Sequence, residues 1–326
     1  MKNKAQFLLT SLTCALALST TVRAEEGGSG HYLPGSMSSF IDAFPGKPGS
    51  LIALDFFTYY DASAPINTSL PFGGMVAADV HATVYADSLF AIYQTPWEVL
   101  GGGLAFGVGV PYVWMEVKGQ AQAINPDGTL APAQNVRDTA DGIGDMTIIP
   151  FMLGWTNVLP DLKVDARLSI YAPTGEYEKG QLANLGKNYW TFEPGIMASW
   201  LSSKIGTEAT LYVGVDFNTK NDVTDYQSGT TFHLDGTLAQ HLPLGKGFIG
   251  VGANGFYYQQ LSGDSGSGAK LGGFEGMTAG VGPVLSYVCK LGEKTDLLAE
   301  LKWLPEVSVD NRLKGDYIWF KLVLAF

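Results

Sequence analysis

The 326-residue chain is poor in cysteine and in charge. It has two cysteines, and Cys14 falls within an N-terminal leader, so Cys289 has no partner for an intramolecular disulfide. Charged residues make up only 16% of the chain, against about 25% in ordinary soluble domains. The net charge of −11 excludes a broad cationic surface that would bind nucleic acid or another polyanion.

Long uninterrupted apolar runs are also absent beyond the leader. The nearest, residues 100–117, is interrupted by glycines and by Pro111, so no segment reaches the ~20 apolar residues that a membrane-spanning helix needs. Hydrophobic residues nevertheless make up 46% of the chain, with 41 glycines and 12% aromatics. Because glycine weakens helices and aromatic residues favour strands, this composition predicts β-structure.

The N-terminus has the three parts of a secretory signal. Lys2 and Lys4 precede an apolar run from residue 7 to residue 18, and Val22-Arg23-Ala24 offers a small-residue cleavage site. We therefore expect a signal peptide over residues 1–24, an irregular lead-in rich in glycine and proline over 25–48, and one β-domain over 49–326. Loss of the leader makes the chain more acidic still.

Alternating polar and apolar residues then continue to the C-terminus. The predicted strands are 50–61, 76–88, 102–117, 143–155, 162–177, 188–202, 207–219, 228–242, 247–260, 276–289, 295–305 and 316–326. Short connections alternate with long ones along this series, and long strands in even number are typical of outer-membrane barrels. The pattern predicts an all-β, transmembrane, antiparallel up-and-down barrel of about 12 strands, with 14 left open.

The last segment, "DYIWFKLVLAF", indicates where the barrel lies. Every second residue back from Phe326 is apolar, whereas the other set contains Lys321. We expect the apolar set to contact lipid and lipopolysaccharide in the outer membrane of a Gram-negative bacterium, and Phe326 to be read by the barrel-assembly machinery. The alternative is the buried terminal strand of a secreted domain. A monomer is expected.

The opposite face of each strand predicts the lining of the lumen, where a substrate would pass. These residues are Asp55, Tyr59, Asp79, His81, Tyr85, Arg167, Tyr171, Glu193, Tyr212, Asp216, His233, Asp235, Phe256, Tyr258, Glu300, Lys302 and Lys321. Aromatic rings interleaved with polar groups suit an amphipathic aromatic ligand. In the lead-in, His31, Tyr32, Phe40 and Phe44 are expected to plug this lumen, the alternative being a periplasmic tail.

No pattern in the chain indicates catalysis, a cofactor or a metal. The four histidines have no metal-ligand spacing, and Asp141 and Asp145 in "DGIGD" are read as the start of a strand rather than as cation ligands. "GDSGSG" at 263–268 is read as a loop tip, since no base can be assigned to its serine.

Several stretches resemble a known family of exported proteins associated with meta-pathway phenol degradation, of the MetA type. They are "GHYLPGSMSSFIDAFPGKPG" (30–49), "DGIGDMTIIPFMLGW" (141–155), "APTGEYEKGQLANLGKNYWTFEPGIMASW" (172–200), "DYQSGTTFHLDGTLAQ" (225–240) and "KGDYIWFKLVLAF" (314–326). The resemblance implies an outer-membrane transporter of aromatic compounds.

Three functions follow from these observations, in decreasing order of support. The first is a channel for passive uptake of small hydrophobic or aromatic compounds. The second is a non-transporting envelope barrel that acts as a scaffold or binds a ligand or lipid. The third is an outer-membrane hydrolase, which would need serine and histidine together on the lipid side of adjacent strands.

Overall fold

The computed structural model describes residues 25–37, 39–273, 275–293 and 295–326, so the predicted signal peptide lies outside the described residues. Two short 3-10 helices, η1 (Glu26–Gly28) and η2 (Phe40–Asp42), precede the strands. The strands are β1 (Leu51–Ser63), β2 (Ser69–Phe72), β3 (Met75–Val99), β4 (Gly102–Ala123), β5 (Gln134–Ile143), β6 (Met146–Thr156), β7 (Leu162–Ala172), β8 (Thr191–Leu201), β9 (Thr207–Asn218), β10 (Thr231–Leu244), β11 (Gly247–Gln260), β12 (Met277–Leu291), β13 (Thr295–Asp310) and β14 (Lys314–Ala325).

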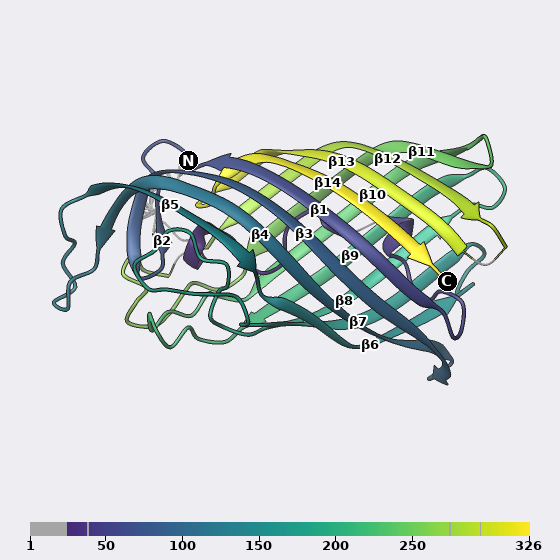
Figure 1. Cartoon of the computed structure of the whole chain (residues 1–326), viewed down its shortest axis with the longest axis horizontal. Coiled ribbons are helices and arrows are strands. Elements are labelled where there is room, and N and C mark those ends of the chain that lie inside the picture. The colour runs from purple at the N-terminus through teal and green to yellow at the C-terminus, as the bar shows by residue number, and fades with distance from the viewer. Residues whose placement is uncertain (1–24, 38, 274, 294) are drawn as a thin grey trace, which may run out of the picture.

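All pairings between these strands are antiparallel, and they close a barrel (Figure 1). Its wall runs β3-β1-β14-β13-β12-β11-β10-β9-β8-β7-β6-β4, and pairing of β3 with β4 closes the circle. Among the described residues, twelve strands form the wall, while β2 and β5 extend it beside β3 and β4. The predicted barrel of about 12 strands is confirmed, with two short strands that the alternation missed.

The two ends of the barrel differ. Short turns such as 100–101 and 245–246 lie at one end with the C-terminus, whereas the loops 173–190, 219–230 and 261–276 lie at the other. The 25-residue β3 and the 22-residue β4 are the longest strands of the described residues, and β2 and β5 pair with their loop-end parts. In outer-membrane barrels the short turns face the periplasm and the long loops face outward. No helix in the described part of the chain is long and apolar enough to cross a membrane.

The side chains of β14 alternate between the outside and the lumen as expected. Phe320 and Phe326 on the outside are 41% and 54% exposed, whereas Trp319 and Lys321 on the inside are fully or almost fully buried. A belt of large apolar side chains also covers the outside of the other strands, with Leu238, Val251 and Leu301 among them. Such a surface is stable against lipid but not against water.

The lead-in runs through the barrel from one end to the other (Figure 1). At the loop end the Glu25 carboxylate pairs with Arg312 and accepts a hydrogen bond from the Tyr258 hydroxyl. At the turn end the Ser50 carbonyl accepts a bond of 3.0 Å from the amide of Gln94 on β3. The residues between fill much of the space that the strands enclose.

Candidate functional site

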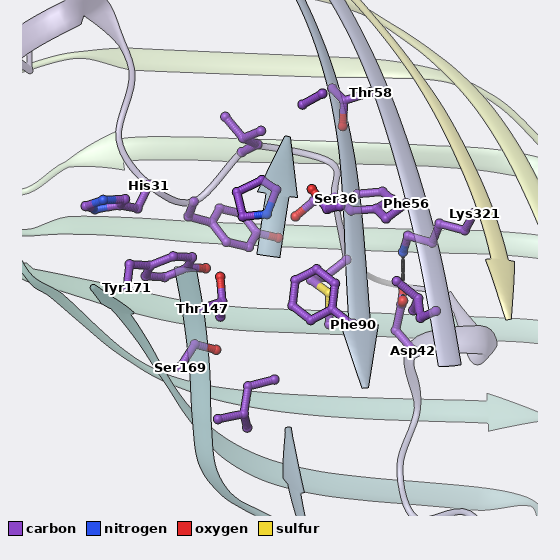
Figure 2. A pocket seen from close by; sticks show the side chains of 18 of the residues that line it. His31, Ser36, Asp42, Phe56, Thr58, Phe90, Thr147, Ser169, Tyr171 and Lys321 are labelled. Atoms are coloured by element: carbon purple, nitrogen blue, oxygen red, sulfur yellow. Dashed lines mark hydrogen bonds and ion pairs between the residues drawn. The ribbon is translucent and has the colours of Figure 1, made fainter. Parts of the chain in front are cut away.

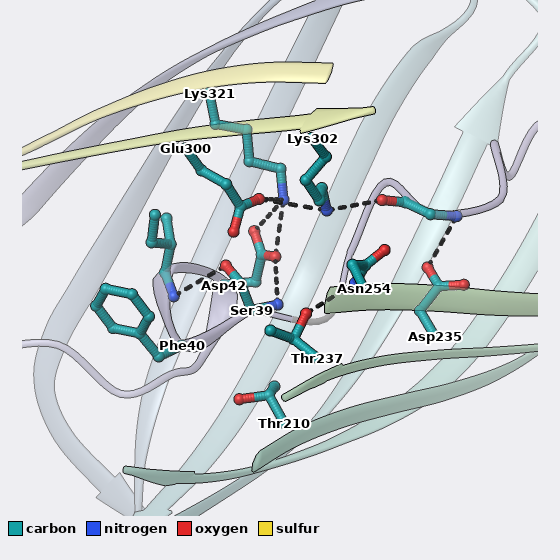
Figure 3. A network of polar contacts seen from close by, with 12 residues as sticks. Ser39, Phe40, Asp42, Thr210, Asp235, Thr237, Asn254, Glu300, Lys302 and Lys321 are labelled. Carbon is teal, nitrogen blue, oxygen red and sulfur yellow. Dashed lines mark hydrogen bonds and ion pairs between the residues drawn. The ribbon is translucent and has the colours of Figure 1, made fainter. Parts of the chain in front are cut away.

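The inner faces of β7 to β14 carry buried charges, and we call this surface the ionic wall. Lys321 lies 2.7 Å from the carboxylate of Asp42 in the lead-in, and the Lys302 ammonium lies 3.3 Å from Glu300 (Figure 3). Arg167 pairs with Asp165 at 2.7 Å and donates to the Asp42 carbonyl at 2.9 Å. Buried charges persist only when they are paired and hydrogen-bonded, and the lead-in supplies some of these partners.

Backbone groups of the lead-in also bind the ionic wall directly. The amides of Phe40 and Phe44 donate to the carboxylates of Glu208 (2.8 Å) and Asp165 (3.1 Å). The Gly35 amide donates to Asp235, and its carbonyl accepts from Lys302 at 2.7 Å. These charge-assisted bonds satisfy a largely irregular backbone that contains only two short 3-10 helices and belongs to no sheet.

Side chains of the lead-in are held in the same way nearer the loop end. The hydroxyl of Tyr32 donates to Asp235, and its ring stacks on that of His233 with centroids 3.6 Å apart. His31 lies between Asp145 (Nε2 to Oδ2, 2.9 Å) and Thr191 (Nδ1 to Oγ1, 2.7 Å). The lead-in is thus fixed along most of its length.

The inner faces of β1, β3, β4 and β6 form a contrasting surface, which we call the apolar wall. They present mainly aliphatic and aromatic side chains, listed here from β1 onward: Ile52, Leu54, Phe56, Tyr60, Ala82, Val84, Ala86, Phe90, Ile92, Val113, Met115, Val117, Ile149 and Met152. Among the hydrogen bonds of the described residues, those that reach this wall from the side of the lead-in come from Gly49 and Ser50, just after the lead-in, which exchange backbone bonds with Gln94.

A cavity of ≈ 800 Å³ lies between the lead-in and the apolar wall (Figure 2). Its lining reaches from Gly27 near the loop end to Phe326 near the turn end. Phe56, Phe90 and Thr58 line it from the apolar wall, while His31 and Asp42 line it from the lead-in. The space therefore follows the long axis of the barrel and is apolar mainly on one side.

Twelve of the predicted lumen residues are on inward faces in the structure. Arg167, Tyr171, Glu193, Tyr212 and Lys321 line the cavity, as do all four predicted plug residues. The other seven, Asp216, His233, Asp235, Phe256, Tyr258, Glu300 and Lys302, are buried in the ionic wall and do not line this cavity. These twelve residues therefore form two groups: five line the cavity, and seven are buried in the ionic wall behind it.

Five predicted lumen residues are placed elsewhere, so the prediction was wrong for them. Asp55 and Tyr59 alternate with the cavity-lining residues of β1 and face outward, and so do His81 and Tyr85 on β3. Asp79 is exposed at a β-bulge with φ of 51°. The prediction assumed that polar residues face the lumen. On β1 and β3 the inward side chains are mainly apolar and line the cavity, so the alternating polar side chains face outward.

Partners of the charged residues were also missed, because they lie far away in sequence. Glu208 accepts from His241 at 2.7 Å. Glu25 of the lead-in pairs with Arg312, and Asp42 of the lead-in pairs with Lys321. Asp145 accepts from the amides of Gly175 (2.9 Å) and Lys187 (2.7 Å) as well as from His31. The alternation of β9, which points Glu208 inward, was the one local pattern that could have predicted any of these residues.

The loop end of the lumen is closed by an apolar cluster. Its members come from the loop end of β1, from β2 to β4 and from two loops: Ala62, Leu70, Phe72, Met75, Ala77, Val80, Ala82, Val117, Ala121, Leu182, Ala183 and Leu313. Contacts of this kind are non-directional, so they can part and close again without leaving charges unpaired.

Above the ionic wall, the loops 219–230 and 261–276 are joined through Asp264. Its carboxylate accepts bonds from the Tyr226 hydroxyl, from the Gln260 amide group and from the Gly229 backbone amide at 2.9 Å. Burial outweighs these bonds and raises the pKa of the Asp264 carboxyl to about 7.

Comparison with solved structures supports the fold. An outer membrane channel from Pseudomonas putida F1 is 14% identical, with a TM-score of 0.59 over 87% of this chain and 98% of that one. The β domain of the Bordetella autotransporter BrkA (10% identity, TM-score 0.46, 85% and 99% coverage) and a Pseudomonas aeruginosa FadL homologue (8%, 0.40, 85% and 89%) are more distant. No curated protein matches the chain.

Residues 67–322 match the model of the family described as "Putative MetA-pathway of phenol degradation". This match spans most of the barrel, and it agrees with the resemblance seen in the sequence. The barrel fold and its apolar belt place the protein in the outer membrane of a Gram-negative bacterium, where its surface contacts lipid and lipopolysaccharide. The chain belongs to the MetA-pathway phenol-degradation family.

Proposed function

We propose that the protein is a channel for passive uptake of small hydrophobic or aromatic compounds across the outer membrane. The observation that carries this proposal is the cavity that follows the long axis of the barrel between the lead-in and the apolar wall. The family description refers to phenol degradation, and the P. putida neighbour is itself an outer membrane channel. The family description supports a substrate of this class, and the neighbour supports the channel fold.

The lining explains which solutes this path favours. A solute that leaves water for the apolar wall gains roughly 25 cal/mol per Å² of apolar surface. A charged solute would lose its hydration there and find no paired partner, because the ionic wall already binds the lead-in. The path therefore favours neutral, apolar molecules over ions and sugars.

At the residue level, we propose that Tyr171 and Tyr212 orient a ring within the cavity. Tyr171 stacks on His31 with centroids 5.1 Å apart, and both tyrosine hydroxyls donate to Glu193. A phenolic or aromatic solute can contact these rings from the cavity while its apolar edge stays against the apolar wall.

The lead-in, residues 25–48, is proposed to be the plug of the barrel formed by residues 49–326. His31, Tyr32, Phe40 and Phe44 of the lead-in line the cavity, so its position sets the width of the path. We also propose that the barrel acts as a monomer and is recognised through Phe326. The Phe326 amide donates to the Leu51 carbonyl at 3.0 Å, next to the seam of β1 and β14.

A second candidate function is favoured by the closed loop end. The apolar cluster over the lumen and the fixed lead-in would suit a barrel that binds a ligand without passing it on. A hydrolase is less well supported. His31 bridges Asp145 and Thr191, but the Thr191 hydroxyl is buried and donates to Asn218 at 2.6 Å rather than to the imidazole.

The test is uptake through an intact outer membrane, because apolar probes cross plain lipid vesicles unaided. A Gram-negative host without hydrophobic channels of its own would express the full chain and take up 1-N-phenylnaphthylamine, followed by fluorescence. We expect faster influx of the probe with no change for a sugar of similar size. Equal influx with and without the protein would instead support the non-transporting barrel.

A further inference from the structure

Three side chains from neighbouring strands meet inside the ionic wall. Nε2 of His233 on β10 lies 3.5 Å from Glu193 Oε1 on β8 and 3.6 Å from Asp216 Oδ1 on β9. All three side chains are at most 2% exposed. None of them takes part in the ion pairs that hold the lead-in.

Several atoms of this cluster lack the partners that buried polar atoms require. Among the described residues, neither ring nitrogen of His233 makes a hydrogen bond, and neither does Asp216 Oδ1. Native structures leave few such atoms, and each one calls for an explanation such as an unseen water or ion. Here the unpartnered atoms of two residues lie side by side.

Two glycines allow side chains at this site to lie close against the backbone. A Cβ added at Gly214 would lie 2.4 Å from Nε2 of His233 and 3.2 Å from Oε1 of Glu193. At Gly195 it would lie 2.2 Å from the hydroxyl oxygen of Tyr212. Any residue other than glycine would therefore displace His233 at the first position, and at the second it would displace Tyr212, which donates a hydrogen bond to Glu193.

We propose that Glu193, Asp216 and His233 bind a divalent transition-metal cation such as Zn²⁺ or Mn²⁺. One imidazole nitrogen and two carboxylate oxygens are suitable ligands for such ions. Ligand atoms on a tetrahedral ion with bonds of ~2.1 Å are ~3.4 Å apart, close to the 3.5 and 3.6 Å found here. The three ligand atoms all lie within 4.8 Å of one another.

The charge of the cluster favours a divalent ion over a proton. With both carboxyl groups ionised, a protonated His233 leaves one net negative charge in a fully buried place, and a neutral His233 leaves two. A divalent cation leaves none. Because unbalanced charge is costly away from water, the cation is the better partner. Glu193 also lines the cavity, which gives the ion a route in.

Outer hydrogen bonds orient two of the three ligands. The hydroxyls of Tyr171 and Tyr212 donate to Glu193, and Thr231 Oγ1 donates to the second oxygen of Asp216 at 2.9 Å. Such partners are typical of metal sites and affect affinity. The His233 ring stacks on Tyr32, so the ion also fixes the surface on which the lead-in lies.

The experiment measures metal binding by the full chain, purified in detergent and stripped with a chelator. Competition with a chromophoric chelator is expected to give one Zn²⁺ per chain. His233→Asn should weaken binding by at least about 100-fold and Tyr212→Phe by about 10-fold, since loss of an outer partner alone costs 10–100-fold. His241→Asn is the matched control, because His241 is also buried but has a hydrogen bond to Glu208 at 2.7 Å.

Wild-type protein gives a second readout that needs no variant. Co²⁺ added to the stripped chain should produce visible absorption bands of a protein-bound ion, and one equivalent of Zn²⁺ should abolish them. Stoichiometric binding lost in His233→Asn but kept in His241→Asn supports the site. Absence of binding, or equal affinity in His233→Asn and wild type, would overturn it whether or not uptake of apolar probes is observed.

Discussion

The two walls of the lumen are built from strands of the same barrel, yet they hold the lead-in differently. The ionic wall binds it through ion pairs such as Lys321 with Asp42, at 2.7 Å. The apolar wall faces it across a cavity and presents side chains such as Val84 and Phe90. Strong directional bonds fix the lead-in to one side, and the opposite side remains free for a solute. The lead-in thus occupies the lumen and still leaves a cavity along one side.

Removing the central cation of the ionic wall should have the largest effect. Lys321→Met leaves Asp42 and Glu300 buried without this partner, and breaking a buried pair in this way costs about 3–5 kcal/mol. We expect the lead-in to loosen, which would raise ion conductance in planar bilayers and lower the thermal unfolding temperature in detergent.

Lys163→Met is the matched control for this change. Lys163 also contacts the lead-in, through the Pro45 carbonyl at 3.3 Å, but its side chain is exposed. Conductance should stay near the wild-type value. If Lys321→Met conducts no more than Lys163→Met, the ionic wall does not hold the lead-in and the comparison fails.

The loops above the ionic wall should respond to pH through Asp264. Its pKa of about 7 lies above the ~4 of an unfolded aspartate, so the folded loops bind the proton more tightly. The free energy that holds these loops closed should therefore fall as pH rises from about 4 to about 7. A pKa difference of about 3 limits this fall to about 4 kcal/mol. Hydrogen exchange of the Gly229 amide, corrected for its intrinsic rate, measures this at pH 5 and pH 8.

The matched variant is Asp264→Asn, which keeps the shape but cannot titrate. Protection of the Gly229 amide should then be the same at both pH values. If protection of the Gly229 amide still differs between the two pH values in this variant, a titratable group other than Asp264 causes the effect.

A polar side chain on the apolar wall should slow apolar solutes. Val84→Asn keeps the volume but binds water in the cavity, and a polar group without a partner costs about 1–3 kcal/mol to strip of water. Influx of 1-N-phenylnaphthylamine should fall about tenfold. Tyr85→Phe, on the outward face of the same strand, should leave influx unchanged; a similar fall there would show that the path does not follow this wall.

The smallest effect is expected on the outside of the apolar wall. Asp55 and Asp87 lie diagonally across β1 and β3 on the outward face, and Asp87 Oδ1 has no hydrogen-bond partner among the described residues. Asp87→Asn should stabilise the barrel by about 1 kcal/mol, because it removes like-charge repulsion and adds a donor. Urea unfolding in detergent measures the change, and destabilisation would mean that the carboxylate has a partner of its own.

The sequence predicted the barrel well because alternation is a local property of each strand. The outward apolar set of β14 and the inward Lys321 follow from period 2 alone. The same reasoning failed at Asp55 and His81, since it took polarity as the mark of the lumen. Strands β2 and β5 were not predicted; they lie outside the twelve-strand wall and pair only with the loop-end parts of β3 and β4.

The candidate sites depend on register and on the lead-in, which the sequence leaves open. Glu193, Asp216 and His233 have no metal-ligand spacing, and they meet only because β8, β9 and β10 pair as they do. Asp42 meets Lys321 across 279 residues. No local pattern encodes such contacts.

The distribution of the lead-in's bonds determines how it would yield to a mechanical pull. Drawn from the turn end, it would lose the Phe44 amide bond to Asp165 first, then the pair of Asp42 with Lys321, and last the pair of Glu25 with Arg312. The contacts resist in series rather than together. The peak force is therefore set by the strongest single contact and not by the sum of all of them.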